Sequence, residues 1–351
     1  MKVIRLLSAA LAVGVLACTS EETPTEPAGS PSLARAVAGK FTAVDLGPLG
    51  ACCSDAWDIN PAGQVVGSSS THSAFLWEKG VTTDLGTLGG TASGATAINP
   101  SAQIVGAIVF AGAPNDDQDD STRAFLWERG AVTVLGSLGG SYSGATDINP
   151  AGQVVGVSYT AGDEASRAFL WEKGAMIDLG TLGGAEASAN GINPAGQVVG
   201  SSTTAAGQNH GFVWEKGVMT DLGALDGMCC SIALDINPRG QVVGVSSDAG
   251  GDSHAVLWEK GVITDLGTLG GNGGPGTAAI AINAAGQVVG YSETAAGQTH
   301  AFLWEHGAMT DLGTLGGSYS QANGINSAGQ VVGTAYTVGD AEYHATLWTR
   351  K

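Results

Sequence analysis

The sequence is poor in charge, and above all in basic residues. Charged residues make up 13% of the 351 positions, and 14 Lys and Arg stand against 32 Asp and Glu, a formal net charge of −18. Because phosphate binding needs clustered Lys and Arg, we expect no nucleic acid among the partners. Low charge combined with 56 Gly and many Val, Leu and Ile is typical of a turn-rich all-β protein.

Several catalytic motifs are also missing. The chain has no G-x-S-x-G, no H-E-x-x-H and no P-loop, and the "S-x-D-x-G-x-T-W" boxes of sialidase-like propellers are absent. We therefore expect a non-enzymatic binding or adhesion protein. Two alternatives stay open, a cation-dependent propeller hydrolase or lyase and a purely structural envelope protein.

The first segment differs from the rest of the chain. "MKVIRLLSAALAVGVLAC" has two basic residues and then an apolar run that is too short to span a membrane. Its end, "VLAC", resembles the lipobox of bacterial lipoproteins, which implies cleavage after residue 17 and lipidation of Cys18. The next stretch, "TSEETPTEPAGSPS", cannot bury a core. We predict a signal peptide at 1–17, a flexible tether at 18–40 and a folded domain at 41–351.

Internal repeats cover the chain from residue 41 onward, with a mean period of about 44 residues. Each repeat holds four short strand patterns, A to D, as in "GATDIN", "QVVGVS", "RAFLWE" and "AMIDLG" between residues 144 and 180. An "IN" pair ends strand A, and its asparagines are Asn60, Asn99, Asn149, Asn193, Asn237, Asn283 and Asn326. A tryptophan ends strand C, at Trp77, Trp127, Trp171, Trp214, Trp258, Trp304 and Trp348.

Four antiparallel strands in each unit of this length predict the blade of a β-propeller, and seven units predict seven blades. The last unit has strands A, B and C but no D, because the chain stops three residues after Trp348. The segment "FTAVDLG" at 41–47 supplies the missing pattern. We predict that it completes the last blade and closes the ring, which removes exposed strand edges. A stacked β-solenoid is the alternative fold.

These units resemble HAF repeats, which occur in predicted extracellular bacterial proteins and are named for a His-Ala-Phe triplet. The triplet is literal at residues 300–302, and "DLGTLGG" and "IN-x-x-G-QVVG" carry more of the likeness. The resemblance covers 41–351 and implies an exported protein, with no established activity or catalytic residues. With the lipobox it favours an outer-membrane lipoprotein or cell-surface location, a membrane contact through the lipid alone, and a monomer.

Only one face of the predicted propeller varies in length between repeats. The A–B step from Asn60 to Gly67 is 7 residues in all seven repeats, and the step from each Trp to the next "LG" is always 8. The B–C step ranges from 10 to 21 residues and the D–A step from 13 to 16. We call the face with the B–C and D–A connections the variable face, and the opposite one the constant face. Functional loops on a rigid scaffold behave like the variable face.

Candidate ligand-binding residues follow from this division. The longest B–C loop holds "NDDQDD", a carboxylate cluster suited to Ca²⁺, although the D-x-D-x-D-G loop is absent. Calcium is therefore the one cofactor the sequence suggests, and a solvated acidic loop is the simpler interpretation. Aromatic residues near the variable face suit contact with an extracellular glycan or protein. The candidate binding residues are Trp57, Asp116, Asp117, Asp119, Asp120, Tyr142 and Tyr319.

Two other groups of residues stand out. Cysteines interrupt the D–A crossovers of repeats 1 and 5, and the near-opposite placement of these repeats favours pairing of Cys52 with Cys53 and of Cys229 with Cys230 over a bridge across the ring. Free thiols are the alternative. Four repeats begin strand C with His210, His254, His300 and His344. Neighbouring C strands lie too far apart to share one metal ion, so we expect a structural role.

The lipobox gives the first testable prediction. We expect residues 1–17 to be removed and Cys18 to carry a diacylglyceryl group, because a basic start, a short apolar run and "VLAC" precede a polar segment. Mass spectrometry of the mature N-terminus checks this. An unmodified N-terminus beyond residue 18 would contradict it.

Overall fold

The chain divides between residues 32 and 33 into two units, and the residues whose structure is described below lie in the second, Leu33–Lys351. A computed structural model describes residues 35–38, 40–47, 52–111, 121–225, 230–248, 250–271 and 276–351. These residues form an all-β fold with two short 3₁₀ turns, η1 (Ala161–Asp163) and η3 (Val338–Asp340). Among them no helix is long and apolar enough to cross a membrane.

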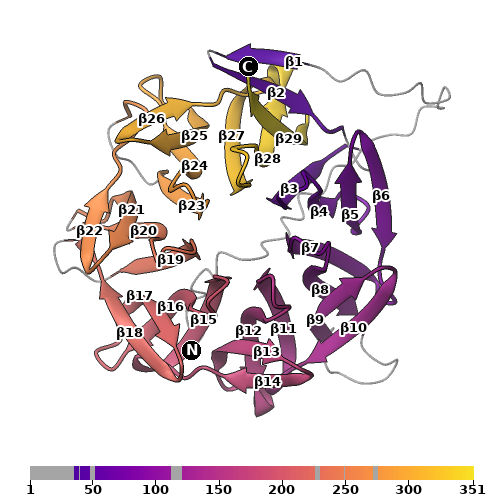
Figure 1. Cartoon of the computed structure of the whole chain (residues 1–351), viewed down its shortest axis with the longest axis vertical. Helices are drawn as coiled ribbons and strands as arrows, with labels where there is room; N and C mark the ends of the chain where they lie inside the picture. Colours follow the sequence, from indigo (N-terminus) through magenta and orange to yellow (C-terminus); the bar gives the residue numbers. More distant parts are fainter. Residues whose placement is uncertain are drawn as a thin grey trace, which may run out of the picture. The chain divides into compact units, whose positions relative to one another are not determined.

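Antiparallel pairing groups the strands into successive sets of four, one for each repeat (Figure 1). Repeats 1 to 3 contain β3 (Ser54–Ile59), β4 (Val65–Ser69), β5 (Ala74–Glu78) and β6 (Val81–Gly86); β7 (Ala92–Ile98), β8 (Ile104–Phe110), β9 (Ser121–Glu128) and β10 (Ala131–Gly136); β11 (Gly139–Ile148), β12 (Val154–Thr160), β13 (Ser166–Glu172) and β14 (Ala175–Asp178). Repeats 4 to 6 contain β15 (Gly183–Ile192), β16 (Val198–Thr204), β17 (Asn209–Glu215) and β18 (Val218–Gly223); β19 (Ser231–Ile236), β20 (Val242–Ser247), β21 (Ser253–Glu259) and β22 (Val262–Asp265); β23 (Ala278–Ile282), β24 (Val288–Glu293), β25 (Thr299–Glu305) and β26 (Ala308–Asp311).

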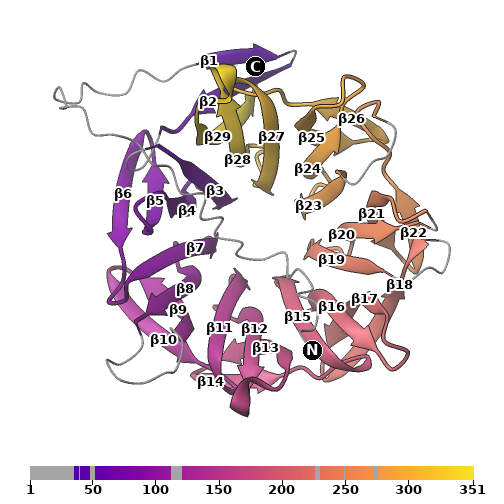
Figure 2. The ribbon, with the colours of Figure 1, turned by 180° about the vertical axis from the view of Figure 1, so that it is seen from behind.

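The seventh repeat joins the two ends of the described chain. It contains β27 (Gly316–Ile325), β28 (Val331–Thr337) and β29 (Tyr343–Arg350), and β29 pairs antiparallel with β2 (Phe41–Asp45), placing Ala43 opposite Trp348. A further strand, β1 (Arg35–Ala38), pairs with the outer edge of β2. Figure 2 shows β1 and β2 beside β29 from the other side. Strand β1 falls within the segment 18–40 that we predicted as a flexible tether.

The sheets extend beyond single repeats at two places. The start of β11 pairs in parallel with β9 through Tyr142 and Thr122, and the start of β27 pairs with β25 through Tyr319 and Thr299. The sheets in the described residues therefore have four, four, four, eight and nine strands, and none of them closes on itself.

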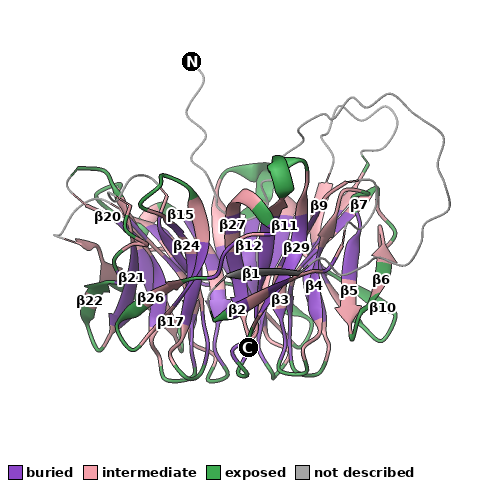
Figure 3. Ribbon diagram, turned by 90° about the horizontal axis from the view of Figure 1, so that it is seen from above, coloured by how far each residue is buried: buried purple, intermediate pink, exposed green. Residues whose placement is uncertain are grey.

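The hydrophobic core lies between neighbouring repeats rather than inside one. In one cluster, Val155 and Leu170 of repeat 3 pack with Ala189, Ile192 and Phe212 of repeat 4. The phenylalanine of strand C is fully buried in five repeats, at Phe75, Phe125, Phe169, Phe212 and Phe302. Figure 3 shows this buried band between exposed turns. Because each repeat buries its apolar side against the next, the sequence must repeat closely.

The constant face is built from turns that need a positive φ. In the A–B turn the fourth position is usually Gly, as at Gly152 with φ 77°, while repeat 2 places Ala102 there with φ 59°. In the C–D turns a basic residue and a Gly both adopt positive φ, as Lys79 (50°) and Gly80 (85°) do. Positive φ at both central residues matches the right-handed twist of a hairpin, so these turns are short and constant in length.

The "IN" asparagine ties each A–B turn to the next repeat. In repeat 3 the Asn149 side-chain oxygen accepts the N–H groups of Ala151 and Gln153, at 3.0 and 3.1 Å. Its amide nitrogen donates to Gln153 Oε1 at 2.7 Å and to the backbone carbonyl of Asn193 at 3.2 Å. The same donation to the next asparagine's carbonyl occurs at 3.1–3.3 Å from Asn60, Asn99, Asn149, Asn193, Asn237, Asn283 and Asn326, the last of which donates to Asn60.

Three aspartates accept hydrogen bonds from backbone N–H groups of the innermost strands near the constant face. A β-bulge before the "IN" pair interrupts the A–B ladder in each repeat. Asp147 accepts the N–H of Ile148 at 2.7 Å and that of Ile192, in the next repeat, at 2.8 Å. Asp58 and Asp235 act in the same way, so three carboxylates take the amides of Ile59, Ile98, Ile148, Ile192, Ile236 and Ile282. No aspartate serves the equivalent Ile325, because the preceding repeat has Ala281 at that position.

Burial raises the pKa of these three carboxyl groups. The pKa of Asp147 rises to about 8, first through desolvation and then through repulsion from Asp235 and Asp58, and backbone N–H bonds oppose the rise. The pKa of Asp235 rises to about 6, and that of Asp58 also increases, again mainly through desolvation. The folded chain therefore binds more protons than the unfolded chain between about pH 4 and 8.

A pH dependence of stability follows. A raised folded-state pKa means that stability is lost as pH increases, so we expect the midpoint of thermal unfolding, Tm, to fall by a few degrees between pH 5 and pH 8. Asp147→Asn should unfold earlier at each pH, because its amide opposes the Ile192 N–H, but its Tm should change less with pH.

Differential scanning calorimetry from pH 5 to pH 8 on both chains measures the two slopes. His254 and His344 also have raised pKa values and contribute with the same sign, so only the difference between wild type and variant reports on Asp147. Equal slopes would show that Asp147 does not titrate in this range.

Candidate functional site

Three tyrosines of repeat 7 form a continuous aromatic group on the variable face, which we call the tyrosine cluster. Tyr319 lies near the start of β27, Tyr336 near the end of β28, and Tyr343 begins β29. The ring centroids of Tyr319 and Tyr336 are 5.5 Å apart, and those of Tyr336 and Tyr343 are 6.0 Å apart in an edge-on arrangement. The three rings are half-buried and so combine a fixed position with access from solvent.

A chain of hydrogen bonds fixes the cluster to the centre of the fold. The Tyr319 hydroxyl donates to Gln321 Oε1 at 2.7 Å, and Gln321 Nε2 donates to Asn323 Oδ1 at 2.7 Å. Asn323 then donates to the carbonyl of Ala56 in repeat 1 at 2.9 Å. Each member of the chain donates in the same direction, so the Tyr319 ring is held in one orientation.

Repeat 1 borders the cluster through Asp55 and two cysteines. The Thr334 hydroxyl donates to Asp55 Oδ1 at 2.7 Å, and burial raises the pKa of Asp55. The negative charge of Asp55 raises the pKa of Tyr343 and of Tyr319, which is the sign expected for neighbouring groups. The site therefore spans the junction of repeats 7 and 1, where the two ends of the described chain meet.

The phenols of Tyr319 and Tyr343 stay protonated at neutral pH. Desolvation is the main cause that raises the pKa of Tyr319 to about 12, with Tyr291 of repeat 6 and Tyr336 adding to it. Desolvation likewise raises the pKa of Tyr343 to about 12. These residues can stack against a ligand and donate hydrogen bonds, but they are poor bases and nucleophiles.

Cys52 and Cys53 lie beside Tyr343 as free thiols. Their Sγ atoms are 2.8 Å apart. Desolvation, the contact with Cys52 and the nearby Glu342 raise the pKa of Cys53 to about 11, although the Tyr343 N–H lowers it. Cys229, the predicted partner of Cys230, lies outside the described residues. The paired disulfides remain a prediction.

The candidate residues from the sequence do not all meet at one place. Tyr319 belongs to the tyrosine cluster, and Tyr142 lies in the same position of repeat 3. Trp57 is the bulge residue of β3, and its Nε1 donates to Ser68 Oγ at 3.1 Å. Outside the described residues lie the lipidation site Cys18 and the acidic residues Asp116, Asp117, Asp119 and Asp120.

One position of the repeat collects most of the unusual residues. Seven residues before the "IN" asparagine stand Cys53, Ala92, Tyr142, Glu186, Cys230, Gly276 and Tyr319. The "SYS" and "CCS" segments therefore occupy the same position of the repeat, at the start of strand A. Sequence reasoning missed their partners on strands B and C, Tyr159, Tyr336 and Tyr343, although these stand three residues after Gly156 and Gly333 and five before Trp348.

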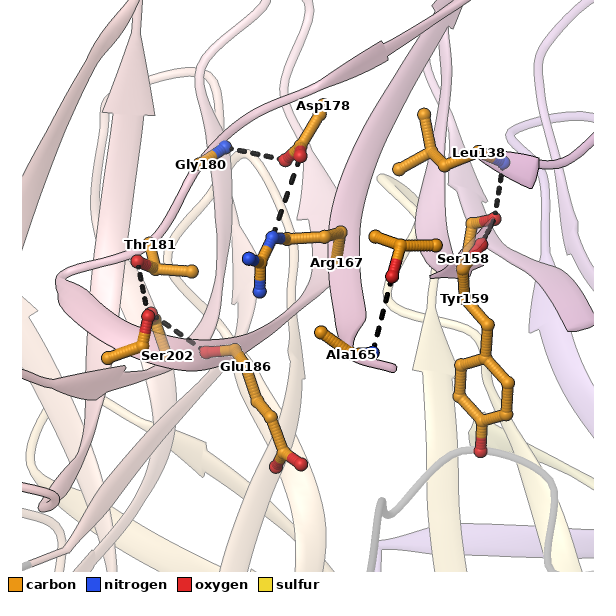
Figure 4. A network of polar contacts seen from close by, with 12 residues as sticks. Leu138, Ser158, Tyr159, Ala165, Arg167, Asp178, Gly180, Thr181, Glu186 and Ser202 are labelled. Carbon is orange, nitrogen blue, oxygen red and sulfur yellow. Dashed lines mark hydrogen bonds and ion pairs between the residues drawn. The ribbon is translucent and has the colours of Figure 1, made fainter. Parts of the chain in front are cut away.

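The second residue of strand C has a structural partner in five repeats. His210, His254 and His300 each place Nδ1 at 2.8 Å from the aspartate of "DLG" in the same repeat. Arg167 fills this slot in repeat 3, with Nε 3.5 Å from Asp178, whose other oxygen accepts the Gly180 N–H at 2.8 Å (Figure 4). His344 bonds instead to Asp45 of β2 at 2.8 Å and to Glu342 at 3.0 Å.

Two of the described loop carboxylates, Asp163 and Asp340, accept hydrogen bonds from the start of strand A in their own repeats. Asp163 accepts the N–H and hydroxyl of Ser141, and Asp340 accepts those of Ser318. These hydrogen bonds lower the pKa of both carboxyl groups, so both are ionised at neutral pH. Among the described residues, no group of three or more His, Cys, Asp or Glu is arranged to hold a metal ion.

Comparison with solved structures supports a β-propeller. The WD40 repeats of RRP9 align with 88% of this chain and 97% of theirs, at 12% identity and a TM-score of 0.54. The β-propeller domain of the Trilobed protease from Pyrococcus furiosus aligns with 90% of this chain and 94% of its own, at 10% identity and 0.51. A puromycin-hydrolyzing peptidase of Mycobacterium tuberculosis aligns with 86% of this chain and 57% of its own, at 11% identity and 0.50.

These similarities concern the fold alone, and they confirm the predicted propeller and the repeat character of the chain. No protein-family model matches the sequence, and no curated protein matches it. The resemblance to HAF repeats therefore stays a prediction.

The cysteine geometry gives a prediction on reactivity. Because the pKa of Cys53 rises from 9.0 to about 11, its thiolate fraction at pH 7.5 should be about 100-fold lower than in the unfolded chain. Alkylation by iodoacetamide, followed by peptide mass spectrometry with and without urea, should show this slowing. Non-reducing maps should find no link between residues 52 or 53 and residues 229 or 230. Such a link, or equal alkylation rates, would contradict the assignment.

Proposed function

We propose that this chain is a non-enzymatic binding protein that holds a glycan at the tyrosine cluster on its variable face. The observation that carries the proposal is the contiguous group of Tyr319, Tyr336 and Tyr343 at the junction of repeats 7 and 1. The chain has 6 tyrosines, and no tyrosine lies in a turn of the constant face. Aromatic side chains of this kind dominate the binding energy of many recognition surfaces.

The chemistry of the cluster favours a neutral ligand with apolar faces. The phenols are uncharged, and the side chains of Gln321 and Asn323 are engaged in the inward chain of hydrogen bonds. The exposed parts of the site are therefore ring faces and edges. Sugars with equatorial hydroxyl groups, such as those in β-1,4-linked chains, present flat C–H faces that stack on aromatic rings, and their hydroxyls remain in water.

A hydrolytic role receives less support from the same residues. Three groups at the cluster that could act as nucleophiles, the Cys53 thiol and the hydroxyls of Tyr319 and Tyr343, have raised pKa values and stay protonated. A nucleophile needs a lowered pKa or an adjacent base. We therefore propose binding rather than hydrolysis. Separately, the lipobox-like sequence leads us to propose that the chain lies in the cell envelope, attached through Cys18.

We further propose that the domain is a seven-bladed propeller closed by its N-terminal strand. The pairing of β2 with β29, the Asp45–His344 contact and the donation from Asn326 to the Asn60 carbonyl support this arrangement. An open ring would leave the last repeat with three strands and expose the edge of β29.

Two deletions test the closure. Removing residues 1–32 takes away only the first unit, so the Tm should stay within about 2 °C of the full chain. Removing 1–47 also removes β1 and β2 with the buried Phe41 and Ala43, and should lower the Tm by about 5 °C or more, or prevent folding. Equal Tm values for the two deletions, measured by circular dichroism, would contradict closure.

Substitution in the cluster tests the binding function. Screening on a glycan array with chitohexaose and cellohexaose as soluble probes should find binding, and Tyr336→Ala should weaken it at least about 10-fold by removing the central ring. Tyr336→Phe keeps the ring and should bind nearly as the parent does. The matched control on the constant face, Glu172→Gln, should leave affinity unchanged. An array without binding, or equal losses from Tyr336→Ala and Glu172→Gln, would overturn the proposal.

A further inference from the structure

Repeat 3 contains a second copy of the loop that carries the tyrosine cluster. "GGSYS" occurs at 139–143 and at 316–320, and "YT-x-G-D" occurs at 159–163 and at 336–340. In both repeats the second segment ends in a 3₁₀ turn, η1 or η3, and strand A starts several residues earlier than in repeats 1, 5 and 6. The two loops are thus alike in sequence and in secondary structure.

The same hydrogen-bonded clasp fixes both loops. Asp163 accepts the Ser141 N–H at 2.7 Å and its hydroxyl at 2.5 Å, and Asp340 accepts both groups of Ser318 at 2.7 Å. The two aspartates have φ values of 55° and 56°. A Cβ placed on Gly140 or Gly317 would lie 2.5 Å from the aspartate oxygen, so both loops require glycine at that position.

The clasp holds a pair of tyrosines in repeat 3 and another pair in repeat 7. The Tyr142 and Tyr159 ring centroids are 5.1 Å apart with planes at 41°, against 5.5 Å and 52° for Tyr319 and Tyr336. Tyr159 is 38% exposed, and in Figure 4 its ring points away from the contacts of Arg167. Repeat 3 therefore presents an aromatic surface of the same construction as repeat 7.

The neighbours of the two tyrosine pairs differ. In repeat 7, Tyr343 adds a third ring, whereas the matching position of repeat 3 is Ser166. Beside Tyr142, Arg123 donates to the carbonyls of Thr122 and Ser141, which fixes the backbone on either side of the ring. The repeat 3 surface has two rings instead of three, so it should bind the same kind of ligand more weakly.

We propose that Tyr142 and Tyr159 form a second glycan-binding site, so that one chain binds two segments of a β-1,4-linked glycan. This inference rests on the proposed function of the tyrosine cluster. Repeats 3 and 7 are separated by three intervening repeats in one direction and by two in the other, and both tyrosine pairs lie on the variable face. A long glycan that reaches both sites would gain affinity because the second contact becomes intramolecular.

The test is titration calorimetry of the full chain with chitohexaose, a probe too short to need both sites. We expect two sites per chain with different affinities. Tyr159→Ala should remove the weaker site and leave the tighter one unchanged, whereas Tyr336→Ala should weaken the tighter one at least about 10-fold and leave the weaker. Tyr159→Phe, which keeps the ring, should retain both sites, and circular dichroism should show that each variant is folded.

The outcomes separate the two proposals. A single site that Tyr336→Ala weakens and Tyr159→Ala leaves unchanged would overturn the second site and leave the proposed function standing. Absence of binding of both chitohexaose and cellohexaose to the parent chain would overturn the proposed function, and with it this inference. Two sites that both survive Tyr159→Ala would also exclude repeat 3.

Discussion

The fold depends on one side chain that is used seven times, the asparagine of the "IN" pair. Asn149 makes two bonds that shape its own turn, one to Gln153 and one to the backbone of the next repeat. A buried amide in which both the oxygen and the nitrogen are satisfied costs little, and replacing it would leave several groups unpaired. The same residue therefore fixes the turn inside a repeat and the spacing between repeats, and this explains why the A–B step never changes in length.

The hydrogen-bond network continues outward from the asparagine of each repeat, as repeat 4 illustrates. Gln197 donates to Glu215 of the "WEKG" turn at 3.0 Å, and Glu215 contacts Lys216 at 3.0 Å. The constant face thus uses its polar side chains in local contacts, from the innermost turn to the outer hairpin. Because this face and the cores between repeats hold the domain together, the opposite loops can differ without loss of the fold, and ligand contacts can evolve there.

Much of the architecture could be predicted because it repeats. The "IN" and Trp positions located the strands, and the lone "FTAVDLG" segment indicated a partner for the last repeat, which the pairing of β2 with β29 matches. The site was predicted only in part. Tyr142 and Tyr319 stood out within "GGSYS", but their ring partners stand on other strands, and the registers of β12, β28 and β29 show which of them lie side by side.

The buried aspartates show a different limit of sequence reasoning. "DIN" in repeats 1, 3 and 5 looked like ordinary variation, since repeats 2, 4, 6 and 7 have Ala or Gly at the same place. The structure gives the reason for this alternation. One carboxylate accepts the amide of its own repeat and that of the next, so every second repeat needs none. An aspartate in each repeat would crowd seven carboxylates at the centre, and repulsion already raises the pKa of Asp147 with three.

The same logic applies to the tyrosines. A position where the repeats differ can mark either tolerated drift or a special task, and composition alone does not separate the two. The clasp of Ser141 with Asp163 and that of Ser318 with Asp340 indicate a special task here, because each pairs a serine with an aspartate at positive φ. The serine, the aspartate and the tyrosine pair occur together in repeats 3 and 7 and in none of the other repeats. Their shared consequence is a pair of tyrosine rings held at a fixed spacing, so the presentation of these rings is what the loops accomplish.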